Sequence, residues 1–260
     1  MGEKSRRKAA FLSAHPLCCY CGVAPSKEPD HMPPRVLFKR REAPEGFEFP
    51  ACVPCNRATR GIEQVVAFYA RALDQDDKNL DVDELRKLIN GIRNNYPHLM
   101  PKVDLSANEK RAALRHRGDA VPPGQFLDDL GIIMLPIEVG PMIDAFAAKL
   151  AKALYYREVV KTLPLDFVVY TRWFDFMHKA AGATIQNMSA ILPNRKIGSR
   201  SNTDIGQQFE YVWGRSDDGL TFGFTAQLGS SIFLVGVAVH EKIDQFRDIE
   251  DESERWTRAI

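Results

Sequence analysis

A chain of 260 residues with 45% hydrophobic and 27% charged side chains can bury one or two cores of ordinary domain size. Its net charge of only +1 excludes a surface that is basic all over, and no apolar stretch approaches the length that crosses a membrane. The first ten residues are charged and unlike a secretory signal, so we expect a cytoplasmic protein with no membrane partner.

Two cysteine pairs are the first feature along the chain that carries chemistry. Cys18 and Cys21 form one Cys-x-x-Cys pair, and Cys52 and Cys55 form a second, with thirty residues between the pairs. Each Cys-x-x-Cys turn points two thiolates at one metal, so the pattern predicts a tetrahedral zinc site. Four thiolates leave the ion no open position, and this zinc would therefore be structural.

The fifth cysteine, Cys19, stands beside the first pair. It could replace Cys18 only in a Cys-x-Cys arrangement, which matches the usual ligand turn less well, so we assign it to packing. The alternative for all five is that they are buried or disulfide-bonded cysteines. Disulfides fit poorly with a cytoplasmic chain.

Three polar side chains accompany the pairs: Asp30 and His31 lie between them, and Asn56 follows Cys55 directly. Carboxylate and amide oxygens are hard ligands for a magnesium-type ion, and an imidazole can take a proton from water near neutral pH. Hydrolysis of a phosphodiester needs an activated water and a cation for the charge that develops on oxygen and phosphorus. The combination predicts a metal-dependent phosphodiesterase site, although Asn56 could instead only cap the helix expected over residues 56–73.

Residues 18–60 resemble an HNH, or His-Me finger, endonuclease of the zinc-stapled kind seen in endonuclease VII-like nucleases. The resemblance rests on CYCG at residues 19–22, EPDHMPP at 28–34 and CVPCN at 52–56. It implies a ββα unit, His31 as general base, and Asp30 and Asn56 as ligands of a catalytic Mg²⁺ or Mn²⁺ ion. Thr59 departs from the pattern, because the family often has a lysine there.

Basic residues surround this motif, and residues 1–60 hold eleven lysines or arginines against six acids, a difference of +5. A charge run is usually a solvated face, but beside a phosphate site it could contact a nucleic-acid backbone. The residues that we assign to DNA binding are Arg35, Lys39, Arg40, Arg41, Arg57 and Arg60.

Apolar periodicity predicts three further helices, over residues 81–96, 106–117 and 140–160. Ser106 and Glu109 form a capping box, and Gly118 ends that helix. Strands are expected over residues 166–173, 207–213, 220–226 and 231–240, and the charged tail from 241 to 260 is expected to be helical or frayed.

These elements predict an α+β fold class in three parts. Residues 1–75 would form a zinc-bound ββα (treble-clef/His-Me finger) module and residues 76–124 a helical connector. Residues 125–260 would form a C-terminal α+β accessory domain with an antiparallel sheet. That domain could choose the target, bind a regulatory ligand or hold a homodimer together.

The function that the sequence favours is a metal-dependent DNA endonuclease of the HNH type, a phosphodiester hydrolase with structural Zn and catalytic Mg or Mn. The main alternative is a non-catalytic zinc module that binds nucleic acid or protein. A third is a nuclease effector controlled by its C-terminal domain. Small motifs do not fix the substrate, so invading, host and branched DNA all stay open.

Overall fold

The structure is a computed structural model that describes residues 2–74, 76, 81–175, 186–187, 192–201, 205, 207–242 and 257–259. Its longer helices are α1 (Glu3–Ala14), α2 (Val53–Ala58), α3 (Arg60–Ala72), α4 (Val82–Asn95), α5 (Ala107–Arg117) and α6 (Val139–Val159). Its strands are β1 (Glu28–His31), β2 (Glu48–Ala51), β3 (Phe167–Asp175), β4 (Asn194–Ile197), β5 (Phe209–Arg215), β6 (Thr221–Leu228), β7 (Ile232–His240) and β8 (Thr257–Ala259). Short 3-10 turns are η1 (Arg35–Leu37), η2 (Lys39–Arg41), η4 (Pro97–Leu99) and η5 (Leu127–Asp129).

Two antiparallel sheets make up the strand content. The small sheet pairs β1 with β2, so that His31 lies opposite Glu48. The large sheet has the strand order β4-β5-β6-β7-β3-β8, and β5, β6 and β7 form a meander. Gly219 and Gly229 lie in the turns of this meander with positive φ, a conformation that glycine adopts without steric cost.

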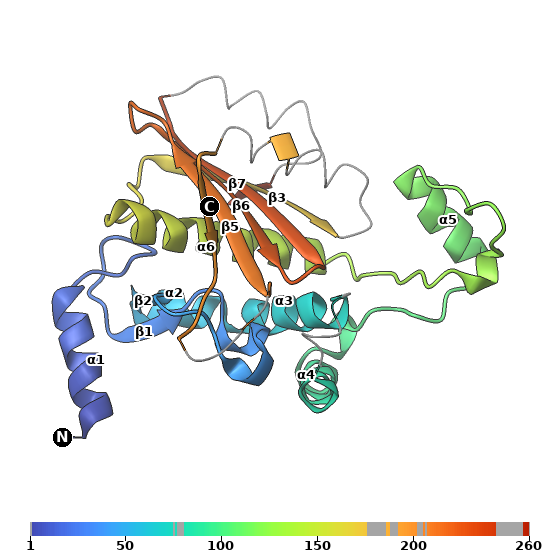
Figure 1. The fold of residues 1–260 in the computed structure, drawn as a ribbon, viewed down its shortest axis with the longest axis horizontal. Helices are drawn as coiled ribbons and strands as arrows, with labels where there is room; N and C mark the ends of the chain where they lie inside the picture. The colour runs from blue at the N-terminus through green and yellow to red at the C-terminus, as the bar shows by residue number, and fades with distance from the viewer. Residues whose placement is uncertain are drawn as a thin grey trace.

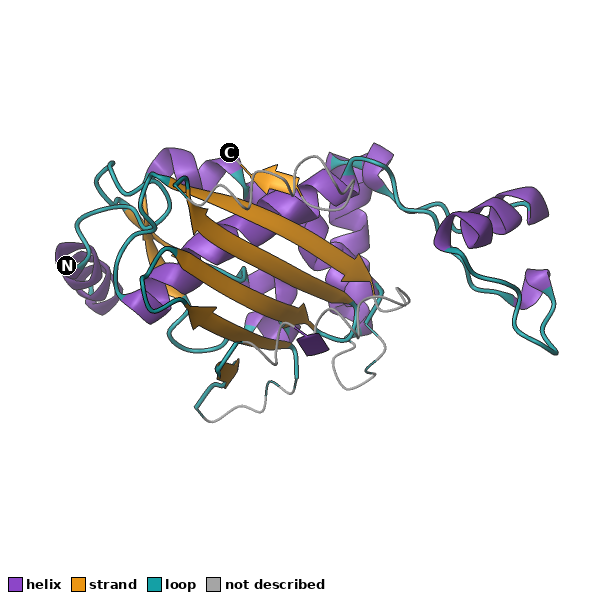
Figure 2. Ribbon diagram, turned by 90° about the horizontal axis from the view of Figure 1, so that it is seen from above, coloured by secondary structure: helices purple, strands orange, loops and turns teal. Residues whose placement is uncertain are grey.

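Helix α6 is the central element of the fold. It crosses one face of the large sheet, and α3 packs against it from the opposite side (Figure 1). Seen from above, the strands lie in front of α6 (Figure 2). A helix covered on two sides must be apolar nearly all round, and its buried residues accordingly run from Val139 to Tyr155 with few gaps.

One buried apolar cluster contains residues from both the N-terminal and the C-terminal halves of the chain. It includes Phe49 from β2, Phe68 from α3, Phe146 from α6 and Phe222 from β6. The hairpin and the large sheet therefore share a core, with α3 and α6 between them. The domain boundaries at residues 75 and 124 stay predictions.

The segment that contains α5 and η5 extends away from the rest of the molecule (Figures 1 and 2). The capping box of Ser106 and Glu109 is present, and Gly118 ends α5 in a left-handed conformation, as the sequence predicts. None of the described helices is long and apolar enough to span a bilayer.

The predicted helix over residues 56–73 is wrong in its start and in its continuity. Pro54 lies in the first turn of α2, which begins at Val53, so Asn56 is inside a helix and not at its start. The chain then breaks at Thr59, whose side chain is bound by polar neighbours, and α3 starts at Arg60.

The remaining elements agree with the sequence to within a few residues, but α1, β4 and β8 were not expected. The helical or frayed tail expected over residues 241–260 is wrong at residues 257–259, and residues 243–256 and 260 lie outside the described residues. Residues 257–259 form β8, which pairs with β3.

Candidate metal centre and adjacent cleft

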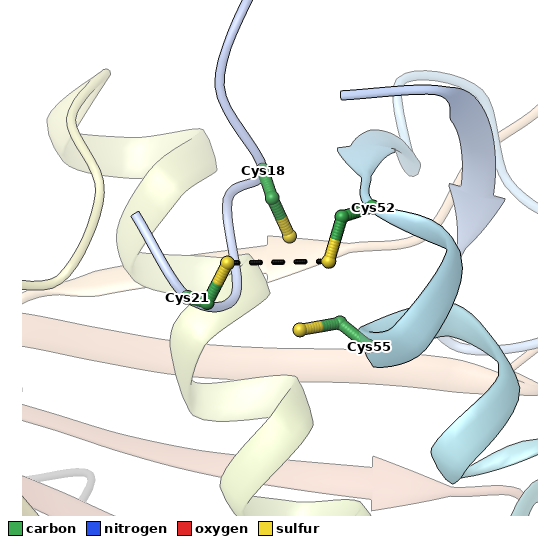
Figure 3. Close-up of side chains that lie close together, drawn as sticks. All are labelled: Cys18, Cys21, Cys52 and Cys55. Atoms are coloured by element: carbon green, nitrogen blue, oxygen red, sulfur yellow. Dashed lines mark hydrogen bonds between the residues drawn. The ribbon is translucent and has the colours of Figure 1, made fainter. Parts of the chain in front are cut away.

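The four cysteines of the two pairs point toward one another (Figure 3). Their sulfur atoms all lie within 4.8 Å of one another, and the Sγ atoms of Cys21 and Cys52 are 4.0 Å apart. Zn–S bonds of about 2.3 Å in a tetrahedron place sulfurs roughly 3.8 Å apart, whereas a disulfide would need about 2 Å. The cluster could therefore hold a metal ion such as zinc.

Local backbone geometry presents each pair. The Cys18 amide donates to Ala24 O, and the Gly22 amide donates to Cys18 O, which closes a tight turn. Gly22 has a φ of +70°, which favours glycine at that position. The second pair lies at the start of a helix, since Cys52 caps α2 and Cys55 is in its first turn.

The thiols of the cluster differ in acidity. Burial raises the pKa of Cys18 and of Cys55. Burial also opposes ionisation of Cys21, but hydrogen bonds from the Ala24 and Val23 backbone lower its pKa to about 7. A thiolate therefore forms more readily at Cys21 than at Cys18 or Cys55, and a metal ion would have to displace protons from those two.

Cys19 lies outside the cluster, buried in the core, and burial raises its pKa. Its amide donates to Pro50 O, which ties the first cysteine turn to β2. A protonated thiol in the core matches the packing role predicted for it.

A cleft of about 370 Å³ lies next to the cysteines, at the end of the hairpin and along α2 and α3. Asp30, His31 and Asn56 all line it. The other lining residues are Glu28, Pro29, Pro34, Arg35, Arg41, Arg57, Arg60 and Glu63. The structure thus brings the three predicted reactive side chains to one cleft, together with four of the six basic residues assigned to DNA.

The His31 side chain is 30% exposed, and its Nε2 atom lies 3.6 Å from Glu48 Oε1. Burial lowers the pKa of His31, and the Arg35 charge acts in the same direction, whereas Glu48 and Asp30 oppose the shift. An imidazole with a lowered pKa is neutral at pH 7 and can accept a proton.

Asp30 lies deeper, only 7% exposed, at the centre of a polar cluster. The Tyr20 hydroxyl donates to Asp30 Oδ2 over 2.7 Å, and Lys149 Nζ lies 2.7 Å from the same oxygen. Lys149 also lies 2.6 Å from Glu63 Oε1, so one ammonium bridges two carboxylates. We define Tyr20, Asp30, Thr59, Glu63 and Lys149 as the Asp30 cluster.

Asn56 is held by a side chain from the hairpin. Its Nδ2 atom donates to Glu28 Oε1 over 2.9 Å. The amide nitrogen is therefore used in a structural contact, and the carbonyl oxygen is the atom left to serve as a ligand. The capping role weighed for Asn56 does not apply, because α2 begins three residues earlier.

The basic residues divide by position. Arg35, Arg41, Arg57 and Arg60 line the cleft, whereas Lys39 and Arg40 are not among the lining residues. The Lys39 amide donates to Gln208 Oε1 and the Arg40 amide donates to Glu84 Oε2.

These two hydrogen bonds link η2 to other parts of the fold. Within η2, Arg40 and Arg41 adopt positive φ values, which are uncommon for residues other than glycine. The backbone of this basic segment is therefore held by specific contacts.

Sequence reasoning missed Tyr20, Glu28, Glu63 and Lys149. Only Lys149 could have been found from the sequence. It lies at helical spacing from Phe146 and Ala153 on the apolar stripe of α6, where a lysine is unusual. The spacing could have marked a buried charge, but not its partners, which come from residues far earlier in the chain.

No family model, curated protein or solved structure matches this chain.

Proposed function

We propose that this chain is a zinc-stapled, divalent-metal-dependent DNA endonuclease of the HNH type. One observation carries the proposal: His31, Asp30, Asn56 and four arginines line one cleft beside a cluster of four cysteines. The first two strands pair antiparallel and run on into α2, which agrees with the ββα order that the sequence resemblance implies.

In this proposal His31 is the general base. A neutral imidazole at the cleft surface can take the proton from a water as that water attacks phosphorus. Burial lowers its pKa, so it is ready for this role at pH 7. The charge of Glu48, whose Oε1 atom lies 3.6 Å from His31 Nε2, favours the imidazolium that forms after proton transfer.

Asp30 and Asn56 would hold the catalytic Mg²⁺ or Mn²⁺ ion, because a carboxylate and an amide carbonyl are the oxygen ligands that such ions prefer. The donor chemistry fits: the known contacts of Asp30 use Oδ2 and that of Asn56 uses Nδ2, so an oxygen of each side chain remains for a ligand. When bound, such an ion stabilises charge on the leaving oxygen.

The arginines in the cleft would contact the DNA backbone. Arg57 and Arg60 come from the second cysteine pair's helix and the helix after it, and Arg35 and Arg41 come from the loop after His31. Guanidinium groups bind phosphate oxygens in bidentate pairs, and such contacts position DNA without reading its sequence.

Cleavage by the zinc-loaded full-length protein tests the proposal. With Mg²⁺ or Mn²⁺ we expect nicks in plasmid or branched DNA, with 5′-phosphate and 3′-hydroxyl ends, and EDTA should stop the reaction. Asn56→Ala and Asp30→Ala should lose activity, and high metal concentration should restore part of it if these residues are ligands.

A second candidate, a non-catalytic zinc module that binds nucleic acid, has one observation in its favour. Both proposed ion ligands are already engaged by neighbouring side chains, Asp30 by Lys149 and Asn56 by Glu28. The same experiment separates the two: salt-sensitive DNA binding with no cleavage of any DNA form would favour the binding module.

A further inference from the structure

Lys149 is a lysine in the middle of the most buried helix of the molecule. Its side chain is 5% exposed, and most of the residues around it on α6 are apolar. A buried ammonium is costly unless partners satisfy it. The partners of the Lys149 ammonium therefore indicate its role.

All three donors of the ammonium group have acceptors. Nζ lies 2.7 Å from Asp30 Oδ2, 2.6 Å from Glu63 Oε1 and 2.8 Å from Thr59 Oγ1. An ammonium carries three N–H donors, so no donor is left over. The Tyr20 ring lies 4.7 Å from Nζ and adds a cation–π contact.

The acceptors come from three places in the chain. Asp30 is in β1, Thr59 lies between α2 and α3, and Glu63 is in the first turn of α3. Through two ion pairs and one hydrogen bond, Lys149 therefore joins the hairpin, the start of α3 and α6 at one point.

We propose that Lys149 is a positioning residue of the candidate site, which holds Asp30 by one carboxylate oxygen and sets how strongly the cleft attracts a divalent cation. This inference rests on the proposed function of the cleft. Asp30 lines the cleft, and Lys149, which lies on the core side, forms an ion pair with its Oδ2 atom. The ion pair therefore fixes the orientation in which the carboxylate faces the cleft.

Lys149 also sets the net charge of the Asp30 cluster. Asp30 and Glu63 with Lys149 carry less net negative charge than the two carboxylates would alone. Without the ammonium, two neighbouring buried carboxylates would attract a cation strongly, because Coulomb attraction is strong where water is excluded. Lys149 thus keeps the affinity of the cleft for a divalent ion low enough that the ion can exchange with solvent.

Mn²⁺ binding to the zinc-loaded full-length protein, measured by the loss of the free-ion electron paramagnetic resonance signal, tests the inference without DNA. We expect Lys149→Met to bind Mn²⁺ about tenfold more tightly or better than the natural protein. The gain should disappear when Asp30→Asn is added. Lys149→Arg keeps the charge and should stay close to the natural affinity.

Lys152→Met is the matched control, since Lys152 is on the same helix, half-buried and outside the Asp30 cluster. Should Lys149→Met fail to fold, Glu63→Gln with Lys149→Met removes one charge of each sign and keeps the net charge of the cluster. In that double variant Asp30 Oδ2 loses its ammonium partner while the net charge stays the same, so we still expect tighter Mn²⁺ binding, by a smaller factor than in Lys149→Met.

Unchanged or weaker Mn²⁺ binding in folded Lys149→Met, alone or with Glu63→Gln, would overturn the inference, as would a gain that survives Asp30→Asn. The outcome is independent of nuclease activity. A protein that never cuts DNA but shows the Asp30-dependent gain would disprove the proposed function and leave the role of Lys149 standing.

Discussion

The cysteine cluster and the Asp30 cluster lie in the same part of the molecule but are built in different ways. The four cysteines come from two short turns within residues 18–55, each shaped by its own backbone hydrogen bonds. The Asp30 cluster needs Lys149, which is 119 positions from Asp30 in the chain and is delivered by the central helix α6. The cysteine cluster is formed by local turns and could hold a metal ion, whereas the Asp30 cluster forms only in the completed fold.

This difference means that the two clusters should fail differently. Loss of a thiolate would remove the zinc that we propose for the cysteine cluster. Loss of Lys149 leaves the turns intact but leaves buried carboxylates without a counter-charge.

The cysteine cluster should give the largest effect on folding. Cys52→Ala should lose zinc and cost more than about 5 kcal/mol of unfolding free energy, because metal binding contributes much of the folding energy of such sites. The shared core should spread the damage to α3 and α6. Elemental analysis and hydrogen exchange check this.

Cys19→Ser is the control for that experiment, because Cys19 is buried outside the cluster. It should keep zinc and cost only about 1–3 kcal/mol, the range for burying a hydroxyl. If Cys19→Ser alone lost zinc, or Cys52→Ala kept an intact N-terminal half, the ligand assignment would be wrong.

The reactive side chain of the cleft should give the next largest effect. His31→Ala should slow cleavage by about 10²–10⁴-fold, the usual contribution of a general base, while zinc content and melting temperature stay nearly unchanged. His98→Ala, an exposed histidine that does not line the cleft, should cut normally. Full activity in His31→Ala would reject the mechanism.

The basic residues should give a smaller, graded effect on binding. The slope of log K for DNA binding against log salt is negative, and each phosphate contact contributes about 0.9 to its steepness. Arg57→Gln with Arg60→Gln should therefore make this slope less steep by roughly 2. Lys39→Gln with Arg40→Gln, outside the cleft lining, should change the slope less. Equal slopes for the two double variants would mean that the cleft has no special part in DNA contact.

The smallest effect concerns pH. Because burial lowers the pKa of His31 below its usual 6.5, the base is already neutral at pH 7. The cleavage rate should therefore rise with pH only in the acid range and be flat between about pH 7 and 8. A rate that kept rising tenfold per pH unit above 7.5 would point to a different base.

The contrast between the clusters also explains how much the sequence could predict. The cysteine turns, the capping box of α5 and the strands of the meander are local patterns, and each was found where its signal lies. The break at Thr59 was not predicted, and Thr59 contacts Lys149, which only the folded chain brings close to it. The same holds for the partners of Asp30, since no spacing rule connects β1 to a lysine on α6.

The most direct test is a crystal structure of the full chain with Mn²⁺ and a map of anomalous scattering. The account predicts two separate peaks, zinc among the four cysteines and manganese in the cleft between Asp30 and Asn56, with His31 facing the same space. A filled cysteine site with no manganese in an accessible cleft, at Mn²⁺ concentrations above those used for cleavage, would contradict it.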